Sequence, residues 1–153
     1  MADLAPETCS CSALRQASRH ITRLYDDALA PVGLGLNQYS ILSKLSRLGP
    51  KNLQHLADLL VMDRSTLGHL LRPLERRDLP TVGVAEQDRR HRVITLTVQG
   101  VALTKQARRL WAKAERRFEH AFGADDALAL LMMLRRVTSL ELAMRNRPGT
   151  PAG

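Results

Sequence analysis

The stretch from residue 52 to residue 97 constrains the fold of this chain more than any other part of the sequence. Leucine and alanine recur at spacings of three and four after Asn52, and again after Asp63, which predicts two short helices that each bury one face. Asn52 and Asp63 are good helix caps, because their side-chain oxygens accept hydrogen bonds from main-chain amides that lack partners in the first turn. Residues 81–84 and 92–96 follow as two strands of a hairpin.

The second of these helices carries a polar face opposite its leucine stripe. The residues on this face are small or polar near its start and basic further along: Ser65, Gly68, His69, Arg72 and Arg76. That order suits a recognition helix, whose first turns contact base edges in the major groove while later arginines contact phosphates. A merely solvated face has the same pattern. The hairpin that follows, with its tip at residues 86–91, favours the nucleic-acid interpretation, because a wing in this place lies beside a minor groove or the DNA backbone.

The order of these motifs resembles the MarR-type winged helix-turn-helix regulators. The resemblance rests on LADLLVMDRSTLGHLLRPLERRDL, followed by DRRHRVITLT and then Gly100. A "DxR, five residues, LT" pattern marks the wing in that family, and it is met here by Asp88, Arg90, Leu96 and Thr97. The resemblance implies a transcription regulator that acts as a homodimer on a pseudo-palindromic double-stranded DNA operator, in the role of a repressor.

The predicted DNA contacts come from the second helix and from the wing. The helix contributes Arg64, Ser65, Thr66, Gly68, His69, Arg72 and Arg76, and the wing contributes Asp88, Arg89, Arg90 and Arg92. Many relatives have threonine where Gly68 stands and arginine where His69 stands. We expect His69 and Arg72 to influence base preference, because they share one helical face with Ser65 and Gly68.

The predicted fold is mainly α-helical with a small β-hairpin wing, and its long terminal helices serve dimerisation. We expect one domain over residues 1–153, because this length suits a single core. Within it, residues 9–30 and 98–146 form dimerisation helices, residues 36–97 form a winged helix-turn-helix DNA-binding lobe, and residues 147–153 form a disordered tail. The last helix is apolar on more than one face, so it needs burial on two sides, which a twofold dimer provides.

The charge of the chain suits a polyanionic partner. Lysine and arginine number 23 against 15 aspartate and glutamate residues, for a formal net charge of +8. Charge alone fits both nucleic acid and an acidic membrane surface. The longest apolar block, at residues 127–134, is far shorter than the roughly 20 residues that cross a bilayer, so we expect a cytoplasmic protein without a membrane partner.

The sequence offers no catalytic motif. The five histidines have no metal-binding spacing, and the chain contains no glycine-rich phosphate loop and no nucleophile elbow. We therefore predict no enzyme activity, no cofactor and no metal. Two alternatives to a DNA-binding regulator stay open at this point: a helical protein-interaction module of winged-helix fold, and a small thiol-dependent enzyme that uses Cys11.

The stretch CSALRQAS, which begins at Cys11 with Cys9 two residues before it, is similar to the start of the organic-hydroperoxide-sensing branch of the same family. The resemblance implies that Cys11 reacts with peroxide and that Tyr25 supports its thiolate. A helix start and the nearby Arg15 favour the thiolate form. The alternative is an inert thiol at a fraying terminus.

Control by a small molecule is the other hypothesis. Relatives bind aromatic acids or similar anions in a cleft between the dimer helices and the DNA-binding lobe. The residues that we expect to line such a cleft are Arg15, Arg19, His20, Tyr25 and Trp111. Residues such as Tyr25 and Trp111 are more often simply part of a hydrophobic core.

Overall fold

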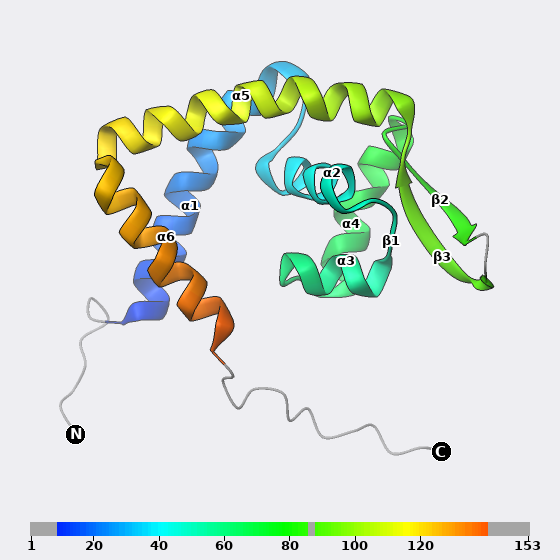
Figure 1. Cartoon of the computed structure of the whole chain (residues 1–153), viewed down its shortest axis with the longest axis horizontal. Helices are drawn as coiled ribbons and strands as arrows, with labels where there is room; N and C mark the ends of the chain where they lie inside the picture. The colour runs from blue at the N-terminus through cyan, green and yellow to red at the C-terminus, as the bar shows by residue number, and fades with distance from the viewer. Residues whose placement is uncertain (1–8, 86–87, 141–153) are drawn as a thin grey trace, which may run out of the picture. The chain divides into compact units, whose positions relative to one another are not determined.

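The computed structural model describes residues 9–85 and 88–140, and its described side chains exclude those of residues 85 and 88–91. The chain is mainly helical with one small antiparallel sheet, which confirms the predicted winged-helix fold class (Figure 1). In chain order the elements are α1 (Ser10–Leu29), the 3-10 helix η2 (Ala30–Val32), α2 (Leu36–Leu48), β1 (Lys51–Asn52), α3 (Leu53–Leu60), α4 (Arg64–Arg76), β2 (Pro80–Ala85), β3 (Asp88–Leu96), α5 (Val98–Phe122) and α6 (Ala124–Ser139).

The chain forms two compact units, one up to Ala114 and one from Glu115 onward. The first unit contains α1 to β3 together with the larger part of α5. The second contains the end of α5 and α6. The predicted DNA-binding lobe at residues 36–97 lies entirely within the first unit.

The hydrophobic core of the first unit is built from the leucine stripes that the sequence predicted. Leu56 and Ala57 from α3 and Leu67, Leu71 and Leu74 from α4 are all buried. They pack with buried residues of α2, including Ile41 and Leu42, in a single cluster. Burial of each leucine side chain contributes roughly 1.5–3 kcal/mol to folding, so the three-helix lobe has a core of its own.

The two predicted helix caps are present. The side chain of Asn52 accepts a hydrogen bond of 2.7 Å from the main-chain N–H of His55, and Asp63 accepts one of 2.8 Å from Thr66. Between α3 and α4 the chain turns at Val61, whose φ of 53° lies in the left-handed region. The caps and this turn fix where α4 begins.

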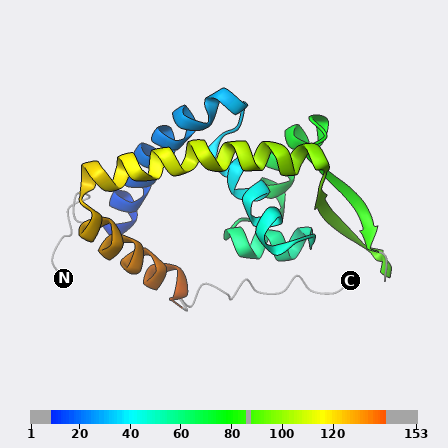
Figure 2. The ribbon, with the colours of Figure 1, turned by 45° about the horizontal axis from the view of Figure 1, so that its top comes forward.

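The sheet has three strands in the order β1-β3-β2, one more than the predicted hairpin. The two predicted strands pair with each other, with Thr81 opposite Thr95 and Val82 opposite Ile94. The additional strand β1 pairs antiparallel with β3, with Lys51 opposite Ile94. The expected tip at residues 86–91 was too long, because the pairing continues through a bulge at Val84 and Ala85 to Asp88. In both views the β2–β3 hairpin extends away from α2, α3 and α4 (Figures 1 and 2).

In the second unit, α6 has no buried residue. Its apolar side chains are open to solvent, with Leu128 at 59% and Met132 at 60% of full exposure. The predicted extension of this helix to residue 146 and the predicted tail at 147–153 lie outside the described residues. Within the described residues, no helix combines the length and the apolar character needed to cross a membrane.

Candidate nucleic-acid interface

Helix α4 presents the predicted polar face to solvent. Leu67, Leu71 and Leu74 anchor its opposite side in the core. The side chains of Ser65, His69, Arg72 and Arg76 are exposed, as is Arg64 at the first position, and Gly68 is half-buried. The helix is therefore held from behind by apolar burial while its basic face stays open.

Asp63 and Thr66 form a cap with two hydrogen bonds at the start of α4. One carboxylate oxygen of Asp63 accepts the main-chain N–H of Thr66, and the other accepts the Thr66 hydroxyl at 2.7 Å. These hydrogen bonds from Thr66 lower the pKa of Asp63 below its ordinary value, so the cap is ionised at neutral pH. Thr66, one of the predicted DNA contacts, thus donates its hydroxyl hydrogen within the protein and also stabilises the helix start.

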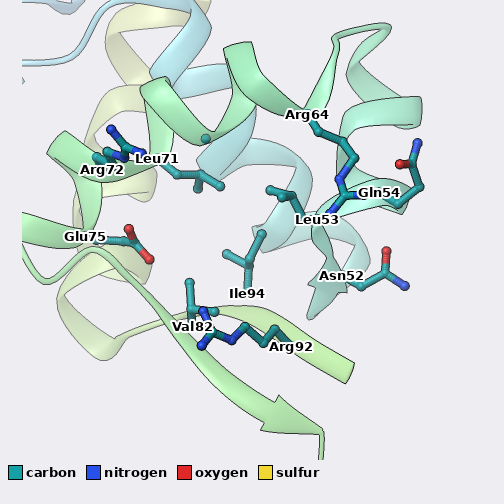
Figure 3. Close-up of a pocket in the computed structure, with 11 residues that line it drawn as sticks. Asn52, Leu53, Gln54, Arg64, Leu71, Arg72, Glu75, Val82, Arg92 and Ile94 are labelled. Atoms are coloured by element: carbon teal, nitrogen blue, oxygen red, sulfur yellow. The ribbon is translucent and has the colours of Figure 1, made fainter. Parts of the chain in front are cut away.

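A groove of about 680 Å³ separates α4 from the wing. Its lining comes from the start of α3, from α4 and from strands β2 and β3: Asn52, Leu53, Gln54, Arg64, Gly68, Leu71, Arg72, Glu75, Val82, Arg92 and Ile94. Figure 3 shows Leu71 and Ile94 at the centre of this site, Arg64 beside Gln54 on one side, and Arg72 and Glu75 on the other. The groove has an apolar floor and charged edges.

The charged edges of the groove suit a nucleic acid. Arg64 and Arg72 from α4 and Arg92 from β3 bring three guanidinium groups to one site. Guanidinium groups bind phosphate and the O6 and N7 edge of guanine through paired hydrogen bonds. The carboxylate of Glu75, in the same groove, is an acceptor of the type that cytosine N4 requires in the major groove.

Three polar side chains of the groove were absent from the predicted DNA-contact set: Asn52, Gln54 and Glu75. Helical spacing places Glu75 beside Arg72 and Gly68, so the sequence held the signal for it. Asn52 was identified only as a cap, and Gln54 lies in the first turn of α3, directly after strand β1, which pairs with β3. No local pattern predicted that pairing.

Of the predicted wing contacts, Arg92 is exposed on β3 opposite Val84. Asp88, Arg89 and Arg90 have their main chain in β3. Their side chains lie outside the described residues, so their DNA contacts stay a prediction.

The exit of the wing is fixed by Thr97. Its hydroxyl donates to the carbonyl oxygen of Asp78 at 2.6 Å and accepts the main-chain N–H of Gly100 at 2.9 Å. The main-chain N–H of Thr97 donates to the carbonyl of Leu79 at 3.0 Å. One threonine therefore joins the end of β3, the loop after α4 and the first turn of α5, which sets the wing against the recognition helix.

A second cavity, of about 520 Å³, lies between α2, the end of α3 and α5. Its wall includes Trp111 and Tyr39, together with the cations Lys44, Arg47 and Arg108. The pKa of Tyr39 is raised because burial disfavours the phenolate, although a hydrogen bond with Ser43 and the charge of Arg108 oppose this rise. The phenol is therefore neutral at physiological pH.

Of the predicted ligand-binding residues, Trp111 alone is in the wall of this cavity. Tyr25 is only 6% exposed and stacks on Trp111 at a ring-centroid distance of 6.5 Å, while Tyr39 stacks on the same indole at 6.2 Å. Arg15, Arg19 and His20 are exposed on α1. The structure thus brings together the three aromatic rings, and lysine and arginine residues of α2 and α5 supply the positive charge at the cavity.

Cys9 and Cys11 are both exposed free thiols. Cys9 is the N-terminal cap residue of α1, where its carbonyl accepts the main-chain N–H of Ala13, and Cys11 lies in the first turn. Tyr25, the predicted partner of Cys11, is on the same helix at the aromatic stack with Trp111.

Known proteins that resemble this chain include DNA-binding regulators. Residues 34–91 match the model of the MarR family, whose members are transcriptional regulators rather than enzymes. The transcriptional repressor CouR, solved bound to a 23-mer DNA duplex, is 29% identical; the match covers 86% of this chain and 94% of CouR, with a TM-score of 0.79. No curated protein sequence matches the chain.

Two further structures share the fold. BpsR of Bordetella bronchiseptica, whose DNA binding is regulated by 6-hydroxynicotinic acid, is 19% identical, with coverage of 92% and 100% and a TM-score of 0.82. A cysteine-to-serine mutant of MarR from E. coli, complexed with operator DNA, is 21% identical, with coverage of 89% and 99% and a TM-score of 0.78. The chain therefore has the fold of MarR-family transcriptional regulators.

Proposed function

We propose that this chain, whose residues 34–91 carry a MarR family domain, is a sequence-specific double-stranded DNA-binding transcriptional regulator that acts as a repressor. The observation that carries the proposal is the groove between α4 and the wing, whose lining includes Arg64, Arg72 and Arg92. A capped, exposed helix beside a basic wing has the dimensions and charge to enter a major groove, which is about 12 Å wide.

The roles of the groove residues follow from their chemistry. Arg72 and Glu75 in the groove offer donors and acceptors to base edges, as does the exposed His69 on the same helix outside the groove, and Arg92 on the wing offers a cation to phosphate. CouR, the 29% identical repressor, was solved on duplex DNA, which supports the same use of the corresponding fold here.

The protein acts as a homodimer on a pseudo-palindromic operator. Support comes from α6, most of whose leucine and methionine side chains are exposed in the single chain: Leu128, Leu131, Met132, Met133 and Leu134. A second copy would bury this apolar surface. In the dimer, two recognition helices about 34 Å apart meet half-sites separated by one helical turn.

Release from DNA follows binding of a small aromatic anion in the cavity beside Trp111. The indole offers a flat apolar surface, and Lys44, Arg47 and Arg108 offer positive charge to a carboxylate. Oxidation of Cys11 is the alternative control, supported by the exposure of both thiols at the start of α1. Titrating the DNA complex with 4-hydroxybenzoate, and separately with cumene hydroperoxide, distinguishes the two controls.

The test of DNA recognition is selection of duplexes from a random-sequence library, followed by affinity measurements at several salt concentrations. We expect one enriched palindromic motif and an affinity that falls steeply with salt. Replacing Arg92 by alanine should weaken binding to selected and random duplexes alike and make the salt slope shallower by about one unit.

The matched control is Arg109→Ala, which removes one exposed arginine of α5 that is not in the groove. If the Arg92 and Arg109 replacements weaken DNA binding equally, Arg92 contributes only through the net charge of the protein and not through its place on the wing. Absence of any enriched motif would contradict sequence-specific binding and favour a protein-interaction module.

A further inference from the structure

Arg77, the C-terminal cap residue directly after α4, is hydrogen-bonded to a loop residue that lies 44 residues earlier in the chain. One terminal nitrogen of its guanidinium donates to the carbonyl oxygen of Gly33 at 2.6 Å, and the other donates to that of Val32 at 3.0 Å. A β-carbon placed at Gly33 would lie 3.5 Å from each of these nitrogens, so the guanidinium rests directly on the loop. This two-pronged contact is specific to arginine, because a lysine ammonium lacks the planar fork.

The same loop is held from its other side by α1. The carboxylate of Asp26, in the last turns of α1, accepts the main-chain N–H of Leu36 at 2.7 Å. Leu36 is the first residue of α2, and its N–H has no partner within that helix. The loop of residues 30–36 is therefore tied to α1 by Asp26 and to the end of α4 by Arg77.

We propose that Arg77 is a positioning residue for DNA recognition, which together with Asp26 fixes the recognition helix relative to α1 through the loop of residues 30–36. This inference rests on the proposed function, because it assigns a role in placing α4 on DNA. Two N–H groups of Arg77 are engaged by main-chain carbonyls, in contrast to a cation that contacts phosphate freely. Loss of the fork leaves the core of the lobe and the Thr97 hydrogen bonds to Asp78 and Leu79 intact, but it removes the link between the end of α4 and the loop of residues 30–36.

The first test uses the free protein and hydrogen exchange. Main-chain amides are hydrogen-bonded in both segments that Arg77 connects, for example that of Gly33 in the loop and that of Leu79 after α4. We expect Arg77→Ala and Arg77→Lys to accelerate exchange in peptides that cover residues 32–36 and 77–79 together, although these segments are remote in sequence. Unchanged exchange at residues 32–36 in Arg77→Ala would overturn the tie.

The second test measures affinity for a duplex selected by the wild-type protein and for a random duplex. We expect Arg77→Ala and Arg77→Lys each to lose about tenfold on the selected duplex, comparable to one lost base contact, and to bind the random duplex with little change. A phosphate contact predicts otherwise: Arg77→Ala would weaken both duplexes equally with a shallower salt slope, and Arg77→Lys would restore them. That outcome overturns the proposal.

Replacing Asp26 provides a test in which the loss of negative charge and the loss of the loop contact predict opposite changes in DNA affinity. Asp26→Ala removes a negative charge, so electrostatics alone predicts tighter DNA binding, whereas loss of the tie predicts weaker binding to the selected duplex. Asp26→Asn is the matched control, since its side-chain oxygen still accepts the N–H of Leu36. We expect weaker selected-duplex binding in Asp26→Ala and at least wild-type binding in Asp26→Asn, and tighter binding in both would overturn the proposal.

The two proposals fail in different ways. A wild-type protein that selects no sequence overturns the proposed function, and with it any role of Arg77 on DNA. The role of Arg77 alone is overturned if the wild-type protein selects a motif and Arg77→Ala prefers that motif over a random duplex as strongly as the wild type does.

Discussion

Gly100, at the start of α5, packs directly against the main-chain carbonyl group of Leu79, at the end of the loop that follows the recognition helix. A β-carbon built on Gly100 would lie 2.9 Å from the carbonyl carbon of Leu79 and closer still to its oxygen. The close approach accompanies the hydrogen bonds of Thr97 to Asp78, Leu79 and Gly100. The position where the wing returns to the helices therefore admits only a glycine.

Replacing Gly100 by alanine should destabilise the protein. The added methyl group overlaps main-chain atoms, which cannot rotate away as a side chain does, so α5 and the loop must separate. We expect a loss of about 2 kcal/mol or more in the free energy of unfolding, measured by urea denaturation. A loss below about 0.5 kcal/mol would mean that the junction adjusts without strain.

Gly68 is the control for Gly100, because the space beside its α-carbon is open rather than filled. It lies inside α4 on the groove face, and a β-carbon there meets no atom within 4 Å. Because an interior helix glycine costs about 0.5–1 kcal/mol relative to alanine, Gly68→Ala should raise the stability by that amount. Thermal unfolding of the free protein measures this gain, and destabilisation would contradict the open space seen beside Gly68.

The cap at Asp63 gives the stability a pH dependence. Hydrogen bonds from Thr66 hold the pKa of Asp63 below its ordinary value of 3.8. A carboxylate with a depressed folded pKa contributes stability that is present above its unfolded pKa and is lost as pH falls through the folded pKa. The difference in unfolding free energy between wild type and Asp63→Asn, which keeps a capping oxygen but does not titrate, should therefore shrink as the pH is lowered from about 7 toward about 3.

The exposed apolar surface of α6 predicts a specific effect on assembly. Leu131 and Leu134 are 45% and 37% exposed in the single chain. Replacing either by aspartate should convert dimers into monomers or aggregates that no longer bind DNA, because a charge would be buried without a partner in the interface. Sedimentation velocity at micromolar concentration measures the assembly state.

The control for α6 is Val98→Asp, which places the same charge on an apolar residue that is 91% exposed at the start of α5. We expect this variant to assemble as the wild type does. A stable wild-type monomer at micromolar concentration would contradict the dimer and leave the apolar face of α6 to another partner.

The sequence by itself determined the features that depend on neighbours within one turn of helix. Asn52 and Asp63 were identified as caps, and their side chains accept the amides of His55 and Thr66. The leucine stripe of α4 is buried as its spacing predicted. Such features are local because capping and helical burial connect residues three or four positions apart.

The tertiary structure alone decided the features that join remote segments. Four features link separate elements: the pairing of strand β1, the place of Gln54 in the groove, the contact of Arg77 with Gly33, and the stack of Tyr25 and Tyr39 on Trp111. Each depends on how helices and strands pack in three dimensions, and packing is set by the shape of the whole core rather than by any periodicity along the chain. For this reason the sequence predicted helix α4 and its exposed polar face, while only the structure determined which side chains line the groove beside it and which residues contact Arg77 at its C-terminal end.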